Sequence, residues 1–344
     1  MKNTGIEIIE SIKKVLTGEK LNIAVLPHEN PDGDAIGSAL GLAGILAGFG
    51  HVVDVISPND YPEFLKWFDS EINVIIYERN KKEGISVLKK ADIIVCVDFN
   101  DAKRAGKLEK KLIESGKPRI LIDHHPDPVP FCELMVSEPS YSSTAELIYD
   151  IVEKIGMKEH ITHNAAEALY TGILTDTGSF AHNTSRPNTF RVVSELMNYG
   201  INTEKIQAAV YHNFSSDRMK LLGYCLNEKM QVFPEFRSAV ITISKKELES
   251  FNFEPGDTEG FVNYPLSIKN IVFSALFIEK ENLVKASFRS KGNFPTNKFA
   301  SVYFNGGGHL NASGGESKLS LEETLEKFTQ LLHVFKDQLI ETII

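Results

Sequence analysis

Three short apolar segments of the chain each lead directly into acidic or histidine side chains. Leu21–Leu26 precedes the sequence HENPDGD, and Ile120–Ile122 precedes the sequence DHH. Ile93–Val97 precedes Asp98, and a further acid, Asp176, lies in the sequence TDTGSF. Carboxylates mixed with imidazoles suit hard or borderline divalent cations such as Mn²⁺ and Mg²⁺. The residue types therefore predict a metal site.

The sequence HENPDGD places two acids where they can face two different ions. Asp32 and Asp34 are separated by Gly33, which lets the backbone bend, and His28 lies four residues before Asp32. Several acids gathered in one place repel each other strongly unless cations lie between them. Two metal ions roughly 3.5–4 Å apart are a known means of hydrolysing phosphate esters, because they hold a hydroxide and neutralise the phosphate oxygens. Any single acid here could instead cap a helix, so the prediction depends on the combination of motifs.

The elements that must position these residues alternate between strand and helix. Short runs rich in β-branched residues and bounded by turn residues are typical of strands buried on both faces. The expected strands are Leu21–Leu26, Val52–Ile56, Ile72–Ile76, Ile93–Val97 and Ile120–Ile122. The expected helices among them are Ala35–Phe49, Lys81–Lys90 and Lys103–Ser115. This alternation predicts an α/β fold with a parallel sheet and helices on both faces, and ligands bind beyond the carboxyl ends of such strands.

The rest of the chain divides into a helical region and a second, smaller α/β region. The expected helices of the first region are Thr144–Ile155, Asn164–Thr175, Asn188–Asn198, Thr203–His212 and Ser215–Leu222. The expected strands of the second region are Met230–Phe233, Arg237–Ile243, Ile271–Ile278 and Leu283–Phe288, and its expected helices are Thr296–Tyr303 and Leu321–Leu339. We therefore expect a catalytic domain at 1–200, a helical connector at 201–225 and a smaller C-terminal α/β domain at 226–344.

Composition and charge exclude several classes of protein. With 344 residues, of which 42% are hydrophobic and 24% are charged, the chain has an ordinary globular composition. The nearest approach to a membrane span, Ala35–Gly50, is short and rich in glycine. The N-terminus does not resemble a secretory signal, so we expect a cytoplasmic protein that does not engage a membrane. Three cysteines without a CxxC pair form neither a disulfide framework nor a zinc site, and the net charge of −9 disfavours long or duplex nucleic acid as a partner.

In combination, the motifs resemble the DHH phosphoesterase superfamily, in the DHH/DHHA1 branch typified by bacterial nanoRNases that are also pAp phosphatases. The N-terminal match runs through HENPDGDAIGS, VDFNDAKRAG, DHHPDP, SSTAELIYDIV and YTGILTDTGSF. The C-terminal match includes SFRSKG and GGGHLNASGG, so the resemblance covers nearly the whole chain. It implies an N-terminal DHH domain that binds metal, followed by a smaller DHHA1 domain that binds substrate.

The resemblance also implies a role for each residue of the N-terminal motifs. The implied ligands are His28, Asp32 and Asp98 for one metal ion and Asp34, Asp98, His124 and Asp176 for the other. Asp98 would therefore bridge the two ions. Asp123 would orient a histidine, and His125 would contact the scissile phosphate or its leaving oxygen. Arg104 matches a family position near the site, although it could equally be a solvated helix residue.

The C-terminal motifs have a chemistry suited to phosphate and nucleotides. Gly306, Gly307 and Gly308 allow close backbone approach and could present successive N–H groups to an anion. Arg289 and Ser290 lie in SFRSKG, and the arginine offers two parallel donors to a phosphate. His309 could contact phosphate or stack on a base. Relatives commonly read HxxAAG where this chain has HLNASG, with Ser313 in place of an alanine.

These features together predict a phosphoesterase that uses two divalent cations, with Mn²⁺ as the expected ion and Mg²⁺ as the second choice. The resemblance implies short RNA oligonucleotides and 3′-phosphoadenosine 5′-phosphate (pAp) as substrates, and a homodimer as a possible assembly. A phosphodiesterase for linear or cyclic dinucleotides such as pApA is the main rival function. The residues leave open, with less support, a pyrophosphatase or exopolyphosphatase and a nucleotide-binding protein without activity. The low positive charge disfavours a processive exonuclease for single-stranded DNA.

Overall fold

The computed structural model describes residues 5–68 and 72–343. The chain divides into two compact units, which we call the first unit (Met1–Asn213) and the second unit (Phe214–Ile344). Among the described residues, no helix is both long enough and apolar enough to cross a bilayer. The range 201–225, expected as a connector, contains a helix of each unit, α8 (Thr203–Tyr211) and α9 (Ser216–Tyr224).

The first unit is built on a parallel sheet, as predicted. Its described strands are β1 (Asn22–Leu26), β2 (Val52–Ser57), β3 (Val74–Ile76), β4 (Ile93–Val97), β5 (Arg119–Asp123) and β6 (Leu134–Ser137). They lie in the order β3-β2-β1-β4-β5-β6, and every pair is parallel. This is the order of a doubly wound sheet, in which the strand order reverses beside β1. The sequence did not indicate β6, a half-buried edge strand.

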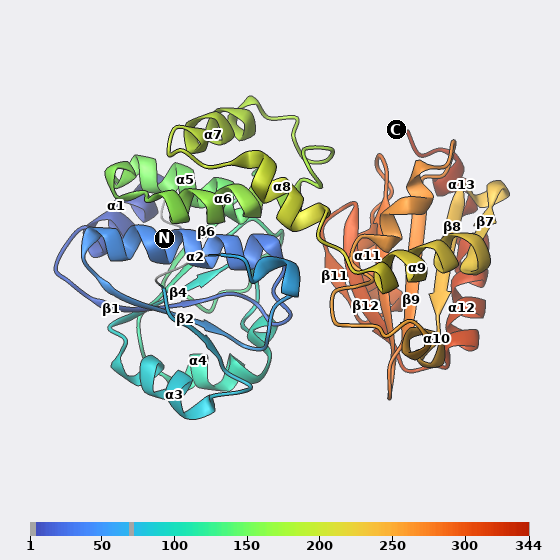
Figure 1. Ribbon diagram of the computed structural model, residues 1–344, viewed down its shortest axis with the longest axis horizontal. Coiled ribbons are helices and arrows are strands. Elements are labelled where there is room, and N and C mark those ends of the chain that lie inside the picture. Colours follow the sequence, from blue (N-terminus) through green and yellow to red (C-terminus); the bar gives the residue numbers. More distant parts are fainter. Residues whose placement is uncertain (1–4, 69–71, 344) are drawn as a thin grey trace. The chain divides into compact units, whose positions relative to one another are not determined.

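Helices cover both faces of this sheet, which confirms the predicted α/β class. The remaining helices of the unit are α1 (Gly5–Leu16), α2 (Gly33–Phe49), α3 (Lys81–Lys90), α4 (Glu109–Glu114), α5 (Thr144–Lys154), α6 (His163–Asp176) and α7 (Pro187–Met197). Figure 1 shows α3 and α4 on one face and α2, α5 and α6 on the other. The helix expected at Lys103–Ser115 is instead a 3₁₀ segment followed by α4. Gly106 interrupts it with φ 54°, and a Cβ there would lie 2.2 Å from the Glu29 carboxylate.

The helices α2 and α6 pack unusually closely, because glycines of α2 face α6. A Cβ at Gly37 would lie 2.4 Å from the carbonyl oxygen of Ala168, and one at Gly44 would lie 3.2 Å from the Cβ of Ala165. Most of α2 is buried, as expected for an apolar helix inside the domain. The close contact matters for the site because α2 begins just after Asp32 and α6 ends at Asp176.

The second unit contains a mixed sheet with an aromatic core. Its described strands are β7 (Met230–Phe233), β8 (Ser238–Ile243), β9 (Phe273–Glu279), β10 (Val284–Ser290), β11 (Gly307–Gly308) and β12 (Ala312–Ser317), in the order β11-β12-β10-β9-β8-β7. Its further helices are α10 (Lys245–Ser250), α11 (Thr296–Tyr303), α12 (Leu321–Val334) and α13 (Lys336–Ile340). Phe273, Phe277, Phe288 and Phe328 pack together in its core. The helix expected at Leu321–Leu339 is divided at Phe335.

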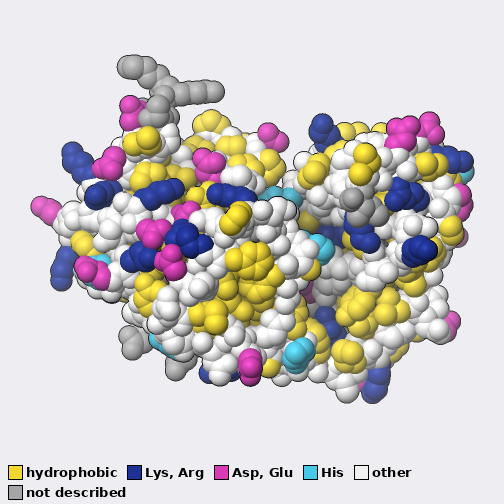
Figure 2. Space-filling model, turned by 90° about the horizontal axis from the view of Figure 1, so that it is seen from above, with side chains coloured by type: hydrophobic (Ala, Val, Ile, Leu, Met, Phe, Trp, Pro, Cys, Tyr) yellow, Lys and Arg dark blue, Asp and Glu magenta, His cyan; other side chains and the backbone are white. Residues whose placement is uncertain are grey.

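Apolar side chains also reach the surface of the first unit. Figure 2 shows apolar side chains gathered on the face of this unit that is seen from above. On α7, Phe190 and Met197 are each 50% exposed, and the ring of Phe190 lies 5.9 Å from that of Phe180. The structure holds one chain, so the expected homodimer stays a prediction.

Candidate active site

Three of the four predicted motif segments follow neighbouring strands of the parallel sheet. His28 lies just after β1, Asp98 follows β4 directly, and Asp123 is the last residue of β5, with His124 next in the chain. Because β1, β4 and β5 are adjacent and parallel, their carboxyl ends meet at one edge of the sheet. The topology therefore brings residues that are about 100 positions apart into one place.

Asp98 lies at the centre of this edge. Its backbone adopts φ 65°, a left-handed conformation that aspartate tolerates better than most residues. Its Oδ2 atom lies 3.6 Å from Nε2 of His28, and its Oδ1 atom lies 3.7 Å from Nε2 of His124. The two oxygens of one carboxylate thus face two different histidines.

The predicted metal ligands form two groups, one on each side of Asp98. The first group is His28, Asp32 and Asp98, and the second is Asp34, His124 and Asp176. Within each group, the possible ligand atoms all lie within 4.8 Å of one another. The first group contains the residues that the resemblance implied for one ion, and the second contains three of the four implied for the other, all but Asp98. Asp98 lies beside this second group, with its Oδ1 atom 3.7 Å from Nε2 of His124.

The acids of these groups are held by the two closely packed helices. Asp34 lies in the first turn of α2, and Asp176 is the last residue of α6. Asp32 caps α2, because its Oδ1 accepts hydrogen bonds from the N–H groups of Asp34 and Ala35 at 3.1 and 3.0 Å. Its other oxygen, Oδ2, lies 3.9 Å from Nε2 of His28. Asp32 therefore serves as a helix cap and still presents one oxygen to the site.

The histidines of the two groups present their Nε2 atoms to the acids. Nδ1 of His28 lies 2.8 Å from the carbonyl oxygen of Glu29, and Nδ1 of His124 lies 3.2 Å from that of Tyr141. A carbonyl oxygen only accepts, so each Nδ1 carries a proton, and when the ring is neutral its lone pair lies on Nε2. This is the tautomer that a metal ligand needs, with the other nitrogen fixed by a hydrogen bond.

The electrostatics of the site indicate missing positive charge. Burial and the nearby charge of Asp98 raise the pKa of Asp34 well above its usual range. Burial would also raise the pKa of Asp98, but the histidines around it lower this pKa instead. Nε2 of His28 is buried and has no hydrogen-bond partner among the described residues. Buried acids beside a lone pair without a partner are the environment that a divalent cation satisfies, so the residues fit a metal centre.

His125 takes part in a different arrangement. Its Nδ1 lies 2.7 Å from Oδ1 of Asp123, and its Nε2 lies 2.9 Å from Nη1 of Arg104. Arginine only donates, so in this arrangement Nε2 of His125 accepts from Arg104, and Nδ1–H donates to Asp123. Burial raises the pKa of Asp123 to about 7. Asp123 and Arg104 thus contact opposite nitrogens of the His125 ring.

Thr144 and Ser38 contact the predicted ligands in ways that sequence reasoning missed or left open. The hydroxyl of Thr144 donates to Oδ1 of Asp98 at 2.8 Å, and its backbone N–H donates to Oδ2 of Asp34 at 2.7 Å. Ser38 donates to Oδ1 of Asp34 at 3.2 Å. The sequence SSTAE signals a helix start, with Ser143 as the cap. It does not reveal which acids that helix start faces.

In the second unit, the loop after β10 is tied to the loop after β11. Oγ of Ser290 donates to the carbonyl oxygen of Phe294 at 2.7 Å, and Nδ2 of Asn311 donates to Oγ of Ser290 at 2.8 Å. Nη1 of Arg289 donates to the carbonyl oxygen of Phe288 at 3.0 Å. The two C-terminal motifs are thus neighbours within this unit, and Ser290 serves their connection.

The glycine run of the second unit lies in a tight hairpin, and the anion nest expected there stays a prediction. The N–H of Gly306 donates to Ala300, and the N–H of His309 donates to Ala312 at 2.7 Å. A Cβ at Gly306 would lie 1.9 Å from the carbonyl oxygen of Gly314. Gly307 and Gly308 form β11 and pair with β12. Close packing therefore explains Gly306 and Gly308, and the N–H groups of Gly306 and His309 are engaged within the unit.

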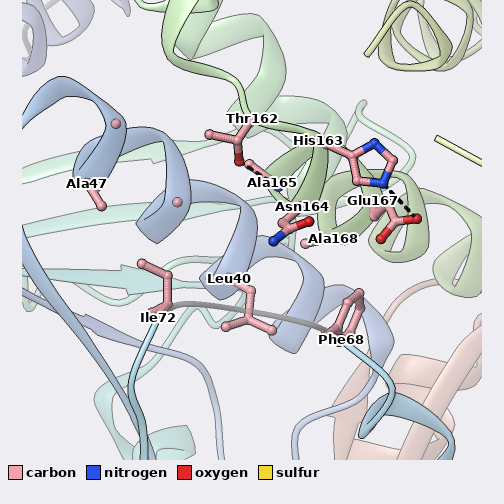
Figure 3. A pocket seen from close by; sticks show the side chains of 12 residues that line it. Leu40, Ala47, Phe68, Ile72, Thr162, His163, Asn164, Ala165, Glu167 and Ala168 are labelled. Carbon is pink, nitrogen blue, oxygen red and sulfur yellow. Dashed lines mark hydrogen bonds and ion pairs between the residues drawn. The ribbon is translucent and has the colours of Figure 1, made fainter. Parts of the chain in front are cut away.

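A separate hollow of about 370 Å³ lies at the other end of the α2–α6 pair. Figure 3 shows Leu40 and Ala47 of α2 facing Thr162 and the start of α6. Its lining includes His163 and Glu167, with Nε2 of the histidine 3.4 Å from Oε1 of the glutamate. The lining residues do not include the predicted metal ligands, which lie at the opposite ends of the same two helices.

The acids and histidines gathered at the carboxyl edge of the parallel sheet, together with the family match and the relatives, indicate a hydrolase of the phosphoesterase class. The chain belongs to the DHH family: residues 22–173 match the model of the DHH family N-terminal domain, and residues 238–341 match that of the DHHA1 domain. The two matched segments fall in the first and second units respectively.

Proteins similar to this chain include two named enzymes and a protein of known crystal structure. The chain is 28% identical to the bifunctional oligoribonuclease and PAP phosphatase NrnA of Thermus thermophilus, covering 93% of this chain and 92% of that protein. It is 28% identical to the cyclic-di-AMP phosphodiesterase GdpP of Bacillus subtilis, of which the match covers 48%. A crystal structure of an exopolyphosphatase-related protein from Bacteroides fragilis is 40% identical and covers 99% of this chain and 100% of that one, with a TM-score of 0.92.

Proposed function

We propose that this protein is a two-metal phosphoesterase that hydrolyses short RNA oligonucleotides to mononucleotides and pAp to AMP. The observation that carries the proposal is the position of Asp98, whose two oxygens face His28 on one side and His124 on the other. The family assignment and the name of the Thermus thermophilus relative support the choice of substrates. We expect Mn²⁺ rather than Mg²⁺, because imidazole ligands are mixed with carboxylates.

Each metal ion would be held by three or four side chains of the first unit. We propose His28, Asp32 and Asp98 for one ion and Asp34, Asp98, His124 and Asp176 for the other. When bound, such ions supply a nucleophilic hydroxide at neutral pH and neutralise charge on the phosphate. The protein supplies Nε2 atoms of histidines held through Nδ1, and it supplies the buried carboxylates of Asp34 and Asp98.

Arg104 and His125 are proposed to act on the substrate phosphate. Arg104 brings positive charge to an edge otherwise rich in acids, and its Nη1 now donates to Nε2 of His125 at 2.9 Å. A phosphate oxygen that accepts from Arg104 instead would free Nε2 of His125 to take up a proton from solvent and donate it to the leaving oxygen. Asp123 would keep the ring in position through its 2.7 Å hydrogen bond to Nδ1.

Residues of the second unit are proposed to bind the rest of the nucleotide. Arg289 offers two parallel donors to a terminal phosphate, and His309 offers a ring to a base or a phosphate. Ser290 and Gly306 would act by holding these loops, because the hydroxyl of Ser290 and the N–H of Gly306 are engaged within the unit. Gly307 and Gly308 are proposed to bind phosphate. The domain limits of 1–200 and 226–344, the cytoplasmic location and the homodimer stay predictions.

A second candidate is hydrolysis of linear or cyclic dinucleotides such as pApA. The observation that favours it is the 28% identity to the GdpP phosphodiesterase over 93% of this chain. Because the chemistry at phosphorus would be the same, the two candidates differ in the substrate and not in the metal centre. Polyphosphate also belongs in the test, since the Bacteroides fragilis protein is described as exopolyphosphatase-related.

The test is a substrate panel in the presence of Mn²⁺. It comprises a ribodinucleotide, a longer RNA, pAp, pApA, cyclic di-AMP, pyrophosphate and polyphosphate. We expect the dinucleotide and pAp to be hydrolysed fastest and both activities to be lost on chelation or in the Asp98→Asn variant. Asp54→Asn removes a half-buried acid of β2, which accepts a hydrogen bond from Asn73 and is not a predicted ligand, and serves as the matched control. Preference for polyphosphate, or near-normal activity of Asp98→Asn, would contradict the proposal, and no metal-dependent turnover would indicate a binding protein.

A further inference from the structure

We propose that Thr144 is a positioning residue of the metal centre, whose hydroxyl fixes the orientation of the Asp98 carboxylate before any ion binds. The inference rests on the proposed function, because it concerns how one of the proposed ligands is held. Thr144 lies at the start of α5, outside the acid and histidine motifs, and it is fully buried at 0% exposure.

The geometry around Asp98 gives Thr144 a distinct role. Its Oγ1 donates to Oδ1 of Asp98 at 2.8 Å. The three histidines that face the same carboxylate, His28, His124 and His125, lie 3.6 to 3.7 Å away, beyond normal hydrogen-bond distance. The hydroxyl thus sets the rotation of the carboxylate. That rotation decides whether one oxygen faces each ligand group.

The start of α5 holds a second proposed ligand through its backbone. The N–H groups of Thr144 and Ala145 donate to the two oxygens of Asp34 at 2.7 and 3.0 Å. The N-terminus of a helix also favours a negative charge. These bonds favour the ionised carboxylate that a cation requires. One turn of helix therefore contacts acids from two different elements, α2 and the end of β4.

The position of Thr144 is set by a network that does not involve the metal ligands. The hydroxyl of Ser143 accepts from the N–H of Glu146 at 3.0 Å. The Glu146 carboxylate is fully buried and accepts from the N–H and hydroxyl of Ser142 and from the hydroxyl of Thr189. Because these contacts hold the loop and the first turn of α5, the hydroxyl of Thr144 is in place in the free protein.

Replacing Thr144 by valine removes the hydroxyl and keeps the shape of the side chain. Loss of a hydrogen-bond partner of a metal ligand typically weakens metal binding by about 10- to 100-fold. We expect a loss of this size in Thr144→Val and in Thr144→Ala, and we expect Thr144→Ser to bind within about 3-fold of wild type. Thr171→Val is the matched control, because Thr171 is equally buried but its hydroxyl donates to the carbonyl of Glu167 within α6.

The measurement is a Mn²⁺ titration of each full-length variant without substrate, in which electron paramagnetic resonance counts the free ion. Circular dichroism of the metal-free proteins checks that each variant is folded. Wild-type affinity in Thr144→Val or Thr144→Ala would overturn the proposal. Equal weakening in Thr144→Ser would also overturn it, because packing and not the hydroxyl would then be responsible. If the wild-type protein itself binds no Mn²⁺, the proposed function fails, which is a separate and recognisable result.

Discussion

The contact between α2 and α6 leads to a sharp prediction for Gly37. A Cβ at this position would lie 2.4 Å from the carbonyl oxygen of Ala168 and 2.8 Å from the backbone nitrogen of Gly172, whereas real Cβ atoms essentially never approach closer than 3.0 Å. Both obstacles are backbone atoms, so neither can rotate away. Gly37→Ala must therefore push the two helices apart by several tenths of an ångström.

The expected cost follows from two opposing effects. Overpacking of a close contact costs about 3 kcal/mol at its upper range, and replacing glycine by alanine inside a helix contributes about 1 kcal/mol of stability. We expect Gly37→Ala to lower the free energy of unfolding by about 2 kcal/mol. At Gly44 the nearest atom is a side-chain Cβ at 3.2 Å, which can shift slightly. Gly44→Ala should therefore be neutral or stabilising by up to about 1 kcal/mol.

The assay is urea unfolding followed by tryptophan fluorescence. The chain has one tryptophan, Trp67, which lies in the first unit, so its signal reports this unit alone. Since α2 carries Asp34 and α6 ends at Asp176, Gly37→Ala should also weaken Mn²⁺ binding, and Gly44→Ala should not. If Gly37→Ala were as stable as Gly44→Ala, the close helix contact would not be what holds these acids together.

Three further predictions concern single groups. Ser313 is 4% exposed, and its hydroxyl has no hydrogen-bond partner among the described residues. Ser313→Ala should therefore raise the free energy of unfolding of the second unit by about 1 kcal/mol, measured by urea titration followed by circular dichroism. A lower free energy of unfolding would refute this reasoning. Hydrogen bonds from Lys158 and Tyr149 lower the pKa of Glu195 from 4.5 to about 2. The ionised carboxylate therefore stabilises the fold above pH 4.5, and this stabilisation is lost as the pH falls towards 2. The melting temperature of Glu195→Gln should depend less on pH across this range, and a pH dependence equal to that of the wild type would refute the prediction. With free Mn²⁺ at 100 times its dissociation constant, adding a chelator should lower the free energy of unfolding by about 2.7 kcal/mol and lower the melting temperature. An unchanged melting temperature would argue against a bound metal.

The sequence predicted most of the first sheet because its strands are buried on both faces. β4 is buried at every position, and such an apolar run bounded by turn residues indicates a strand without further context. β6 is half-buried at every position, so its pattern resembled a loop. The β11–β12 hairpin was missed for a different reason: Gly307, Gly308, Gly314 and Gly315 have little intrinsic preference for strands. Close approach of neighbouring backbone atoms requires glycine only at Gly308 and Gly315.

The same distinction applies to the candidate site. The acids and histidines were predicted because they follow strands whose carboxyl ends meet, which is a property of the local pattern together with the topology of the sheet. The contacts of Thr144 depend on where α5 lies relative to β4 and α2, and the sequence around Thr144 signals only a helix start. The bond between Arg104 and His125 likewise joins residues whose separation along the chain gives no sign of contact.

The left-handed backbone of Asp98 means that two separate requirements limit which residues can occupy this position: the backbone conformation and the chemistry of the site. A side chain with an ordinary Cβ costs roughly 1–2 kcal/mol in this conformation, while glycine, asparagine and aspartate are tolerated. A library of all substitutions at position 98, sorted only for folded protein, should therefore be enriched in glycine and asparagine over alanine. Sorted instead for turnover, the same library should retain aspartate alone, because the backbone tolerates a few residues and the chemistry requires a negative charge with two oxygens.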